Sequence, residues 1–537
     1  MTKPDVVVQV LDGRDTIGGT KIAVGWQGEG AFLDFGINYA RWGRYYEEYL
    51  KPRSAVGLGD LWKLRLIPRF AGLYRKDVIP PGLREADAMP VGGPSGVFLS
   101  HAHLDHAGLI GLLQPRVPII ASPLTAAILK AGQDSGKSEL WTSPCYSNQY
   151  KRQTVGKQEV FRSDSKAPAL GRRLLVPEGS ANGSLTRFWS TFPWVDESDQ
   201  PQEMRSEGVG LYRGETGLSA KAHLVDHSVL GGSAFILESP NGPIVYTGDL
   251  RAHGKHAEST IAFLEGLKRR RPYALLIEGT QVHAPGRLDA ARHEPRTEAG
   301  VAVHCLSAVD AHRGRLVLAD FAPRNVERLL TFLDVARRTH RKLVVFPKDA
   351  YLLYAMHQAD ASIPLPGGDL VIYDPPAGTE GAWEKWLLQS QFPNALVSSE
   401  ELRRAPGDFI LCFSYFDLKH LLDLEPAGGA YIYSNSEAHG EEAEIDFGRL
   451  HNWLTFFGLD VLGFQMTPDP QRGGKLRPQP VGGYHCSGHM PGDDVLDWVV
   501  QIHPDHLVPV HTEHANGFVE AVRELTDVRV NLEGLVR

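Results

Sequence analysis

Cysteine is scarce in this chain and is spread widely. The 537 residues include four cysteines, and no two of them form a C-x-x-C pair. They are Cys145, Cys305, Cys412 and Cys486. Disulfide frameworks and thiolate zinc sites both need grouped cysteines, so the sequence argues against both and favours a reducing compartment.

Long apolar runs are missing too. We find no stretch of about 18 apolar residues, the length that spans a bilayer. The start of the chain, "MTKPDVVVQVLDGRD", lacks the basic residues and apolar segment of a secretory signal. We therefore predict a cytoplasmic protein with no membrane partner.

The chain has no surplus of positive charge. Lysine and arginine total 56 against 64 acidic residues, a net charge of −8. Nucleic-acid binding uses lysine and arginine, so any such surface must be a local basic groove. Residues 51–76 are basic and include Trp62, Phe70 and Tyr74. They predict either side chains that pack against a loop and helix, or one wall of a phosphate-binding groove.

The length and the apolar patterning predict two domains of α/β class. A chain of this size exceeds one ordinary core, and one domain can be inserted in the other. Apolar runs separated by glycine turns predict an early sheet, with strands at 6–11, 21–26, 31–36 and 96–100. Later, a strand at 315–321, a helix at 324–341 and a strand at 342–347 predict a parallel sheet.

The stretch "SHAHLDHAGL" (100–109) crowds four possible metal ligands directly after a predicted strand. His101, His103, Asp105 and His106 lie where that strand turns into an expected helix, "AGLIGLL" (107–113). Imidazole and carboxylate groups suit zinc and similar divalent ions. A loop of solvated histidines is a poor alternative for so dense a cluster.

Three further candidate ligands lie at predicted strand ends. His227 precedes an apolar strand, Asp249 follows "PIVYTG", and His511 follows "HLVPV". Each alone is more often a surface or core residue than a ligand. Their shared position next to strands makes a common site the better hypothesis.

Together these residues resemble a known family. "SHAHLDHAG" resembles the H-x-H-x-D-H motif of the metallo-β-lactamase fold, and His227, Asp249 and His511 follow in the order of that family's other ligands. "ALLIEGT", "YHCSGHMPGDDV" and "VPVHTEH" resemble the extra motifs of the β-CASP branch, which includes ribonuclease J and the cleavage and polyadenylation endonuclease family.

The resemblance implies an αββα metallo-β-lactamase sandwich and two divalent ions, zinc or manganese. His101, His103 and His227 would hold one ion, and Asp249 would bridge the two. The other ion would be held by Asp105, His106 and His511. Asp105 and Asp249 thus belong to the implied catalytic set. Two cations share charge on phosphate oxygens and activate water near neutral pH.

The resemblance also implies roles for residues beyond the ligands. His489 matches the family's general acid, and Glu278 would orient it. Asp34 matches an aspartate that orients a ligand histidine, although a carboxylate that caps a turn is the alternative.

Four residues are candidates for contact with substrate phosphate. His485 and Ser487 lie in a glycine-containing turn, and Asn325 and Arg328 lie at a strand-to-helix turn. Loop packing is the alternative for the first two. A helix cap and a solvated arginine are the alternative for the others.

The ligand positions predict the domain boundaries. Residues 1–269 and 481–537 would form the metallo-β-lactamase domain, and residues 270–480 an inserted α/β β-CASP domain. The polar segment 131–218 is an expected insertion or lid. The chain stops 26 residues after His511, which leaves no space for the C-terminal domain of ribonuclease J.

The function predicted from these features is a nuclease that cleaves single-stranded RNA, internally or from the 5′ end. The same chemistry on DNA stays open. A lactonase, esterase or thioesterase of this fold would not need Glu278 and His489, and a non-catalytic scaffold would not keep all seven ligands. The sequence also leaves open a homodimer or another protein partner, the polarity of cleavage and the pathway.

Overall fold

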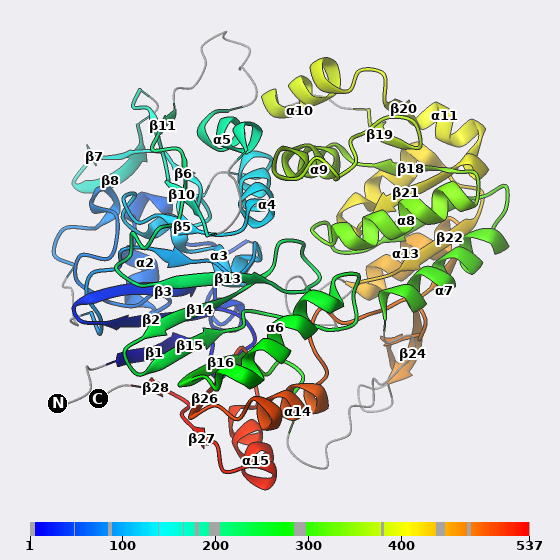
Figure 1. The fold of residues 1–537 in the computed structure, drawn as a ribbon. Helices are drawn as coiled ribbons and strands as arrows, with labels where there is room; N and C mark the ends of the chain where they lie inside the picture. The colour runs from blue at the N-terminus through cyan, green and yellow to red at the C-terminus, as the bar shows by residue number, and fades with distance from the viewer. Residues whose placement is uncertain are drawn as a thin grey trace.

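The computed structural model describes most of the chain. It covers residues 6–47, 49–83, 89–137, 139–164, 166–177, 182–192, 204–283, 297–376, 381–435, 446–469 and 474–535. Figure 1 shows two parts, a β-sandwich at the left and a second α/β part at the right. The first and last described strands, Val6–Asp12 and Gly534–Leu535, pair with each other in the sandwich.

The first sandwich sheet contains the early strands that the sequence predicts. Its order is β12 (Val209–Leu211), β10 (Leu174–Val176), β5 (Ile119–Ile120), β4 (Val97–Phe98), β3 (Glu29–Phe35), β2 (Lys21–Trp26), β1 (Val6–Asp12), β28 (Gly534–Leu535). The strands β1, β2 and β3 form an antiparallel meander, and β2 is buried along its whole length. The alternating and continuous apolar runs of the sequence account for this placement.

The second sandwich sheet combines strands from the middle and the end of the chain. Its order is β13 (Ala220–Leu224), β14 (Ser233–Ser239), β15 (Gly242–Tyr246), β16 (Ala274–Glu278), β26 (His506–Val510), β27 (Arg529–Val530). β16 pairs in parallel with β15 on one side and β26 on the other. The sandwich therefore extends to Glu278, beyond the boundary expected at 269.

The second part is a parallel sheet flanked by helices. Its order is β20 (Leu396–Ser398), β19 (Leu370–Asp374), β18 (Lys342–Val345), β21 (Phe409–Phe413), β17 (Leu316–Asp320), β22 (Gly429–Tyr433), β23 (Leu459–Leu462). Every pair is parallel, which confirms the prediction from the strand–helix–strand pattern. β17, β21 and β22 are fully buried, as central parallel strands are.

Smaller sheets lie outside these three. One contains β11 (Met204–Ser206), β9 (Ala169–Gly171) and β6 (Tyr146–Ser147), and two hairpins pair β7 (Tyr150–Val155) with β8 (Gln158–Ser163) and β24 (Phe464–Asp469) with β25 (Lys475–Pro480). The expected insertion at 131–218 thus has structure of its own, and it also contributes β10 and β12 to the first sheet. Residues 138, 165, 178–181 and 193–203 of that segment lie outside the described residues.

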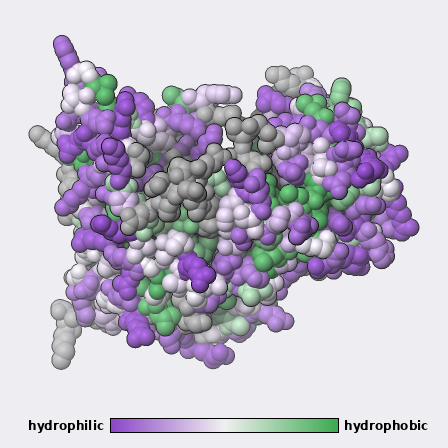
Figure 2. All heavy atoms as spheres, turned by 90° about the horizontal axis from the view of Figure 1, so that it is seen from above, coloured by the Kyte–Doolittle hydropathy of each residue, from purple (hydrophilic) through white to green (hydrophobic). Residues whose placement is uncertain are grey.

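The helices cover the faces of the sheets. They are α1 (Tyr39–Trp42), α2 (Gly59–Lys63), α3 (Leu104–Ala107), α4 (Pro123–Asp134), α5 (Gly183–Ser190), α6 (Ala257–Arg270), α7 (Glu298–Ala311), α8 (Val326–Arg338), α9 (Pro347–Ala359), α10 (Ala382–Trp386), α11 (Ser399–Arg404), α12 (Leu421–Leu424), α13 (Phe447–Phe456), α14 (Gly492–Ile502) and α15 (Ala515–Leu525). No helix of the described residues is long and apolar enough to cross a membrane. The face shown in Figure 2 is largely hydrophilic, with hydrophobic side chains in separate groups.

The helix expected at 107–113 differs from the one observed. α3 begins earlier, at Leu104, and ends at Ala107. The amide of Leu109 donates to the carbonyl of Phe35 in β3, 3.0 Å away, instead of continuing the helix. The chain after the histidine cluster is therefore held against the sheet.

The aromatic side chains of segment 51–76 pack inside the protein, as the first of the two interpretations predicts, and do not line a phosphate-binding groove. Trp62, Phe70 and Tyr74 are buried, and the rings of Trp62 and Tyr74 lie 5.9 Å apart. Arg75 is also buried and forms an ion pair with Asp77 at 2.6 Å. These aromatic rings are core residues, so they do not form an open stacking surface.

The two parts share one hydrophobic core, most visibly where α4 meets α9 (Figure 1). Polar groups join this contact as well. Lys130 and Asp134 of α4 form a buried ion pair at 2.7 Å, and the hydroxyl of Tyr351 in α9 donates to Asp134 at 2.8 Å. Removal of one partner would leave a buried charge, so this contact holds the parts in a defined arrangement.

One buried acid predicts pH-dependent stability. Asp320, at the end of β17, is buried and accepts a hydrogen bond from the Tyr431 hydroxyl. Burial raises the pKa of Asp320 to about 7 from an ordinary 3.8. The folded state thus binds this proton more tightly than the unfolded state, and stability falls as pH rises from about 4 through 7.

We expect Asp320→Asn to remove this pH dependence, since an amide does not ionise. The stability of the variant relative to the parent should improve by about 2–3 kcal/mol between pH 5 and pH 8. Urea unfolding of both proteins at the two pH values measures the change, with exposed Asp374→Asn as the control. If the free energies of unfolding of variant and parent differ by the same amount at both pH values, the prediction is wrong.

Candidate metal centre

The predicted ligands lie at strand ends of both sandwich sheets. The histidine cluster follows β4, and His103 is the N-cap residue of α3. Asp249 follows β15, and His511 comes directly after β26. His227 lies in the connection between β13 and β14. The fold therefore brings residues from four parts of the sequence to one place.

The first group consists of His101, His103, His227 and Asp249. Their ligand atoms lie within 4.8 Å of one another. His101 Nε2 is 3.0 Å from His103 Nδ1, and His227 Nε2 is 3.4 Å from the same His103 atom. Four donors at this spacing fit one divalent ion.

The second group consists of Asp105, His106 and His511, again within 4.8 Å of one another. His511 Nε2 is 3.2 Å from Asp105 Oδ2, and His106 Nε2 is 3.4 Å from it. Asp249 Oδ2 lies between the two groups, 3.6 Å from His101 and 3.3 Å from His106. This is the position that a bridging carboxylate needs.

Buried polar atoms without partners support cation binding at these groups. Asp105 Oδ1, His106 Nε2 and Asp249 Oδ1 have no hydrogen-bond partner among the described residues. A buried carboxylate oxygen or imidazole nitrogen left in this state is costly. Divalent cations that take nitrogen and oxygen ligands would satisfy all three atoms.

The histidines of the first group are neutral near pH 7. Burial lowers the pKa of His101, His103 and His227, and that of His103 falls to about 4. A neutral imidazole keeps the lone pair with which it binds a cation.

In the second group the pKa of the histidines is raised, the opposite of the first group. Burial opposes protonation of His106 and His511, but the nearby carboxylates Asp249 and Asp105 outweigh it and raise the pKa of both imidazoles. Burial likewise opposes ionisation of Asp105 and Asp249, and the imidazoles outweigh it and hold the pKa of both carboxyls well below the usual range. These carboxyls are therefore ionised despite burial.

Asp34 lies where the resemblance places an orienting aspartate. It is fully buried, and its Oδ2 accepts a hydrogen bond from His106 Nδ1 at 2.7 Å. The amide of Ser100 donates to Oδ1 at 2.7 Å, and the hydroxyl of Tyr246 donates to Oδ2 at 2.5 Å. Because Nδ1 of His106 faces Asp34, its Nε2 faces the metal groups. Ser100 and Tyr246 were not predicted from the sequence.

Glu278 and His489 form a close pair beside the second group. His489 Nδ1 is 2.7 Å from Glu278 Oε2, and the amide of Leu250 donates to Glu278 Oε1 at 2.7 Å. The same atoms allow another arrangement, because ligand atoms of both residues lie within 4.8 Å of Asp249 and His511. The pair could thus serve proton transfer or metal binding.

Thr280 joins this pair to a predicted ligand, although the sequence analysis did not single it out. Its hydroxyl donates to Glu278 Oε2 at 2.6 Å and accepts from His511 Nδ1 at 2.9 Å. The only sequence indication is its place at the end of "ALLIEGT", two residues after Glu278.

The four residues predicted to contact phosphate have partners within the protein. Arg328 is fully buried, and it donates to Glu298 at 2.9 and 3.0 Å. Asn325 accepts from the Arg328 amide and caps α8, as the alternative interpretation expected. The geometry gives both residues structural roles.

The two residues near His489 also have internal contacts. The ring nitrogens of His485 face the carbonyls of Asn435 and Gly463, at 3.2 and 2.5 Å. Ser487 Oγ accepts from the His489 amide at 3.0 Å and from Gln281 at 2.6 Å. Ser487 therefore shapes the loop that carries His489.

A buried arginine connects the metal centre to the second part. Arg251, two residues after Asp249, lies 2.6 Å from Glu327 and 3.0 Å from Glu298. It also lies 3.4 Å from Asp226, the neighbour of His227. Its place in "GDLRAHG" gave no indication of this role, because both glutamates come from the second part of the chain.

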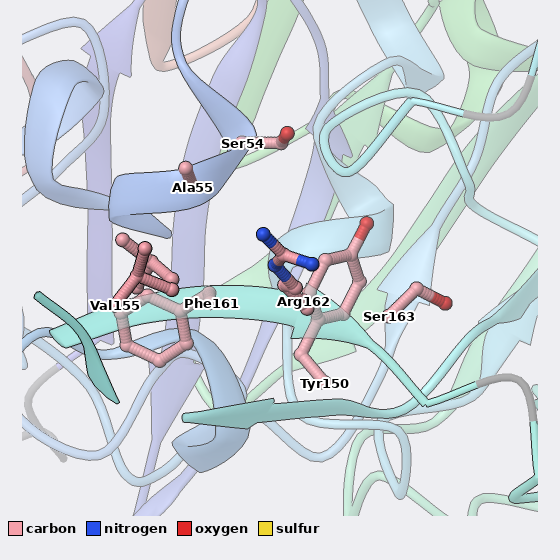
Figure 3. A pocket seen from close by; sticks show the side chains of 8 residues that line it. Ser54, Ala55, Tyr150, Val155, Phe161, Arg162 and Ser163 are labelled. Atoms are coloured by element: carbon pink, nitrogen blue, oxygen red, sulfur yellow. The ribbon is translucent and has the colours of Figure 1, made fainter. Parts of the chain in front are cut away.

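A separate open pocket of about 410 Å³ lies between η1 (Ser54–Val56) and the β7–β8 hairpin (Figure 3). Ser54, Tyr150, Phe161 and Arg162 are among its lining residues. None of the predicted metal ligands lines it, so the pocket is not part of the candidate centre.

Comparisons with known proteins find a partial sequence match and a structural match over nearly the whole chain. No family model matches the chain. Ribonuclease J of Pyrococcus abyssi (strain GE5 / Orsay) is 28% identical over 148 residues, which cover 27% of this chain and 29% of that protein. The crystal structure of a protein of unknown function from Enterococcus faecalis V583 matches with a TM-score of 0.63 at 21% identity, over 99% of both chains. The structural match supports the fold alone.

The centre predicts that metal retention depends on Asp249. The parent protein, loaded with Zn²⁺ or Mn²⁺ and desalted, should retain the metal. Asp249→Asn should retain much less, because one carboxylate lies between both groups. Elemental analysis measures the content, with exposed Asp505→Asn before β26 as the control. Equal content in all three proteins would contradict the assignment.

Proposed function

We propose that the chain is a metal-dependent phosphodiesterase of the β-CASP branch of the metallo-β-lactamase superfamily, and that it cleaves single-stranded RNA. The observation that carries this proposal is the Glu278–His489 pair, at 2.7 Å, beside a buried cluster of histidines and aspartates. A phosphodiesterase needs both parts, since its poor leaving group must be protonated. The similarity to ribonuclease J supports the choice of RNA.

In this proposal the second part, with its parallel seven-stranded sheet, is the inserted β-CASP domain. The substrate lies between the two parts in this hypothesis, because Arg251, two residues after Asp249, pairs with Glu298 and Glu327 of the second part and so brings that part next to the metal centre. Domain junctions commonly hold such sites. The segment 131–218 is a guide or lid for the strand in the same hypothesis.

The chain's own residues position the reaction. His101, His103, His227, Asp105, His106 and His511 would hold the ions, with Asp249 between them. Two divalent cations, when bound, lower the pKa of a water molecule and share the charge on the phosphate oxygens. Asp34 fixes the ring of His106 through Nδ1.

Proton transfer to the leaving oxygen falls to His489. Its Nδ1 faces Glu278, which leaves Nε2 to hold the proton that is donated. The water gives one proton to solvent and its oxygen bonds to phosphorus. The bond from phosphorus to the leaving oxygen breaks, and that oxygen takes the proton from Nε2. Glu278 stabilises the protonated ring before transfer, and solvent returns the proton afterwards.

The proposal predicts RNA cleavage that depends on Asp249. Purified parent protein with Zn²⁺ or Mn²⁺ should cleave end-labelled single-stranded RNA, and Asp249→Asn should not. Gel analysis of the products separates release of 5′ mononucleotides from internal cuts. Cleavage of matched DNA alone would move the proposal to DNA, and cleavage of neither by metal-loaded protein would overturn it.

The role of His489 as an acid predicts a dependence on the leaving group. His489→Ala should slow RNA cleavage by about 10²–10⁴-fold. It should slow hydrolysis of bis(p-nitrophenyl) phosphate much less, because nitrophenolate leaves without a proton. Initial rates on both substrates measure the difference, with the partly exposed His503→Gln as the control.

Metal analysis of the same variants distinguishes the two arrangements of this pair. If His489→Ala and Glu278→Gln keep the parent metal content, the pair serves proton transfer. Loss of metal together with equal slowing on both substrates would instead make the pair part of the ligand set.

A further inference from the structure

Arg324 reaches the metal centre from the second part of the chain. It lies in the loop between β17 and α8, and its side chain is half-buried. Its Nη1 donates to the carbonyl of Ala102 at 2.9 Å. Ala102 is the residue between the predicted ligands His101 and His103, so this guanidinium lies next to the first metal group.

The topology of the parallel sheet places Arg324 where ligands bind in such sheets. β17 and β22 are neighbours, but α8 leads from β17 to β18 on one side and α13 leads from β22 to β23 on the other. Ligands of open α/β sheets bind at the carboxyl ends of strands where the connections diverge in this way. The loop with Arg324 begins at the carboxyl end of β17.

The charge of Arg324 is not neutralised within the described residues. Arg251 and Arg328 are fully buried and have carboxylate partners, whereas the interaction described for the Arg324 side chain is with a neutral carbonyl. Its charge also helps to lower the pKa of His103, after the larger effect of burial. A guanidinium has five N–H donors, so most of them are left for a ligand.

We infer that Arg324 binds a backbone phosphate of the nucleic-acid strand at the edge of the metal centre. This inference rests on the proposed function. Guanidinium groups bind phosphate oxygens with paired hydrogen bonds, and Arg324 is free of the carboxylates that occupy Arg251 and Arg328. The sequence pattern predicted Asn325 and Arg328 of the same turn as phosphate contacts, whereas the contacts in the structure favour their neighbour Arg324.

The test measures how strand binding depends on salt. Fluorescence anisotropy follows labelled single-stranded RNA and DNA on metal-loaded His489→Ala protein, in which cleavage is slow. Three further variants are made in this His489→Ala background: Arg324→Gln, Arg324→Lys and the control Arg313→Gln. Arg313 is exposed, belongs to the second part and forms an ion pair with Asp310 at 2.6 Å. Dissociation constants are measured between about 0.05 and 0.3 M salt.

Arg324→Gln should weaken binding on the order of tenfold and reduce the slope of log affinity against log salt by about 0.7, the value for one lost phosphate contact on a single strand. Arg324→Lys should keep the parent slope, because it keeps the charge. Arg313→Gln should match the parent in both. Unfolding temperature and metal content should stay unchanged in every variant.

If Arg324→Gln keeps the parent's slope of log affinity against log salt, the inference is wrong and the nuclease proposal stays in place. Loss of metal or of thermal stability without a change in slope would do the same, since it would make the Ala102 contact structural. No strand binding by His489→Ala protein at the lowest salt would overturn both proposals.

Discussion

Burial of aspartate side chains among imidazoles is the constraint on which the centre depends. Asp34, Asp105 and Asp249 are each at most 9% exposed, so each would be costly without a partner. His106 lies within 3.4 Å of all three, and its hydrogen bond from Nδ1 to Asp34 fixes the ring. The strand ends of both sheets are therefore held at the spacing that these contacts require.

A second balance of buried charge ties the sandwich to the parallel-sheet part. Arg251 and Arg328 share Glu298 as a partner, and Arg251 also pairs with Glu327. Arg251 reaches the carbonyl of Ser487 at 3.2 Å, next to the loop of His489. Removal of one member would leave an unpaired buried charge, so these pairs hold the second part against the loops of the centre.

Much of the fold, and the residues that the structure brings together as candidate ligands, could be predicted from the sequence, because both depend on short sequence patterns. Apolar runs predicted β1, β2, β17 and α8 within a few residues. The end of the sandwich section was placed too early, since nothing local to β16 tells whether it pairs with β15 or begins a new sheet. The helix after the histidine cluster was misplaced because Leu109 bonds to β3, a contact distant in sequence.

The sequence by itself determined which side chains could bind metal, because a dense group of histidines and aspartates after a strand has few other uses. It also determined the α/β class, through the periodicity of its apolar residues. Only the tertiary structure decided which charges are neutralised. Arg328 and Arg324 lie four residues apart in one turn, yet Glu298 occupies the first and a backbone carbonyl faces the second. Such a difference depends on what distant segments place beside each residue, and no local pattern carries that information.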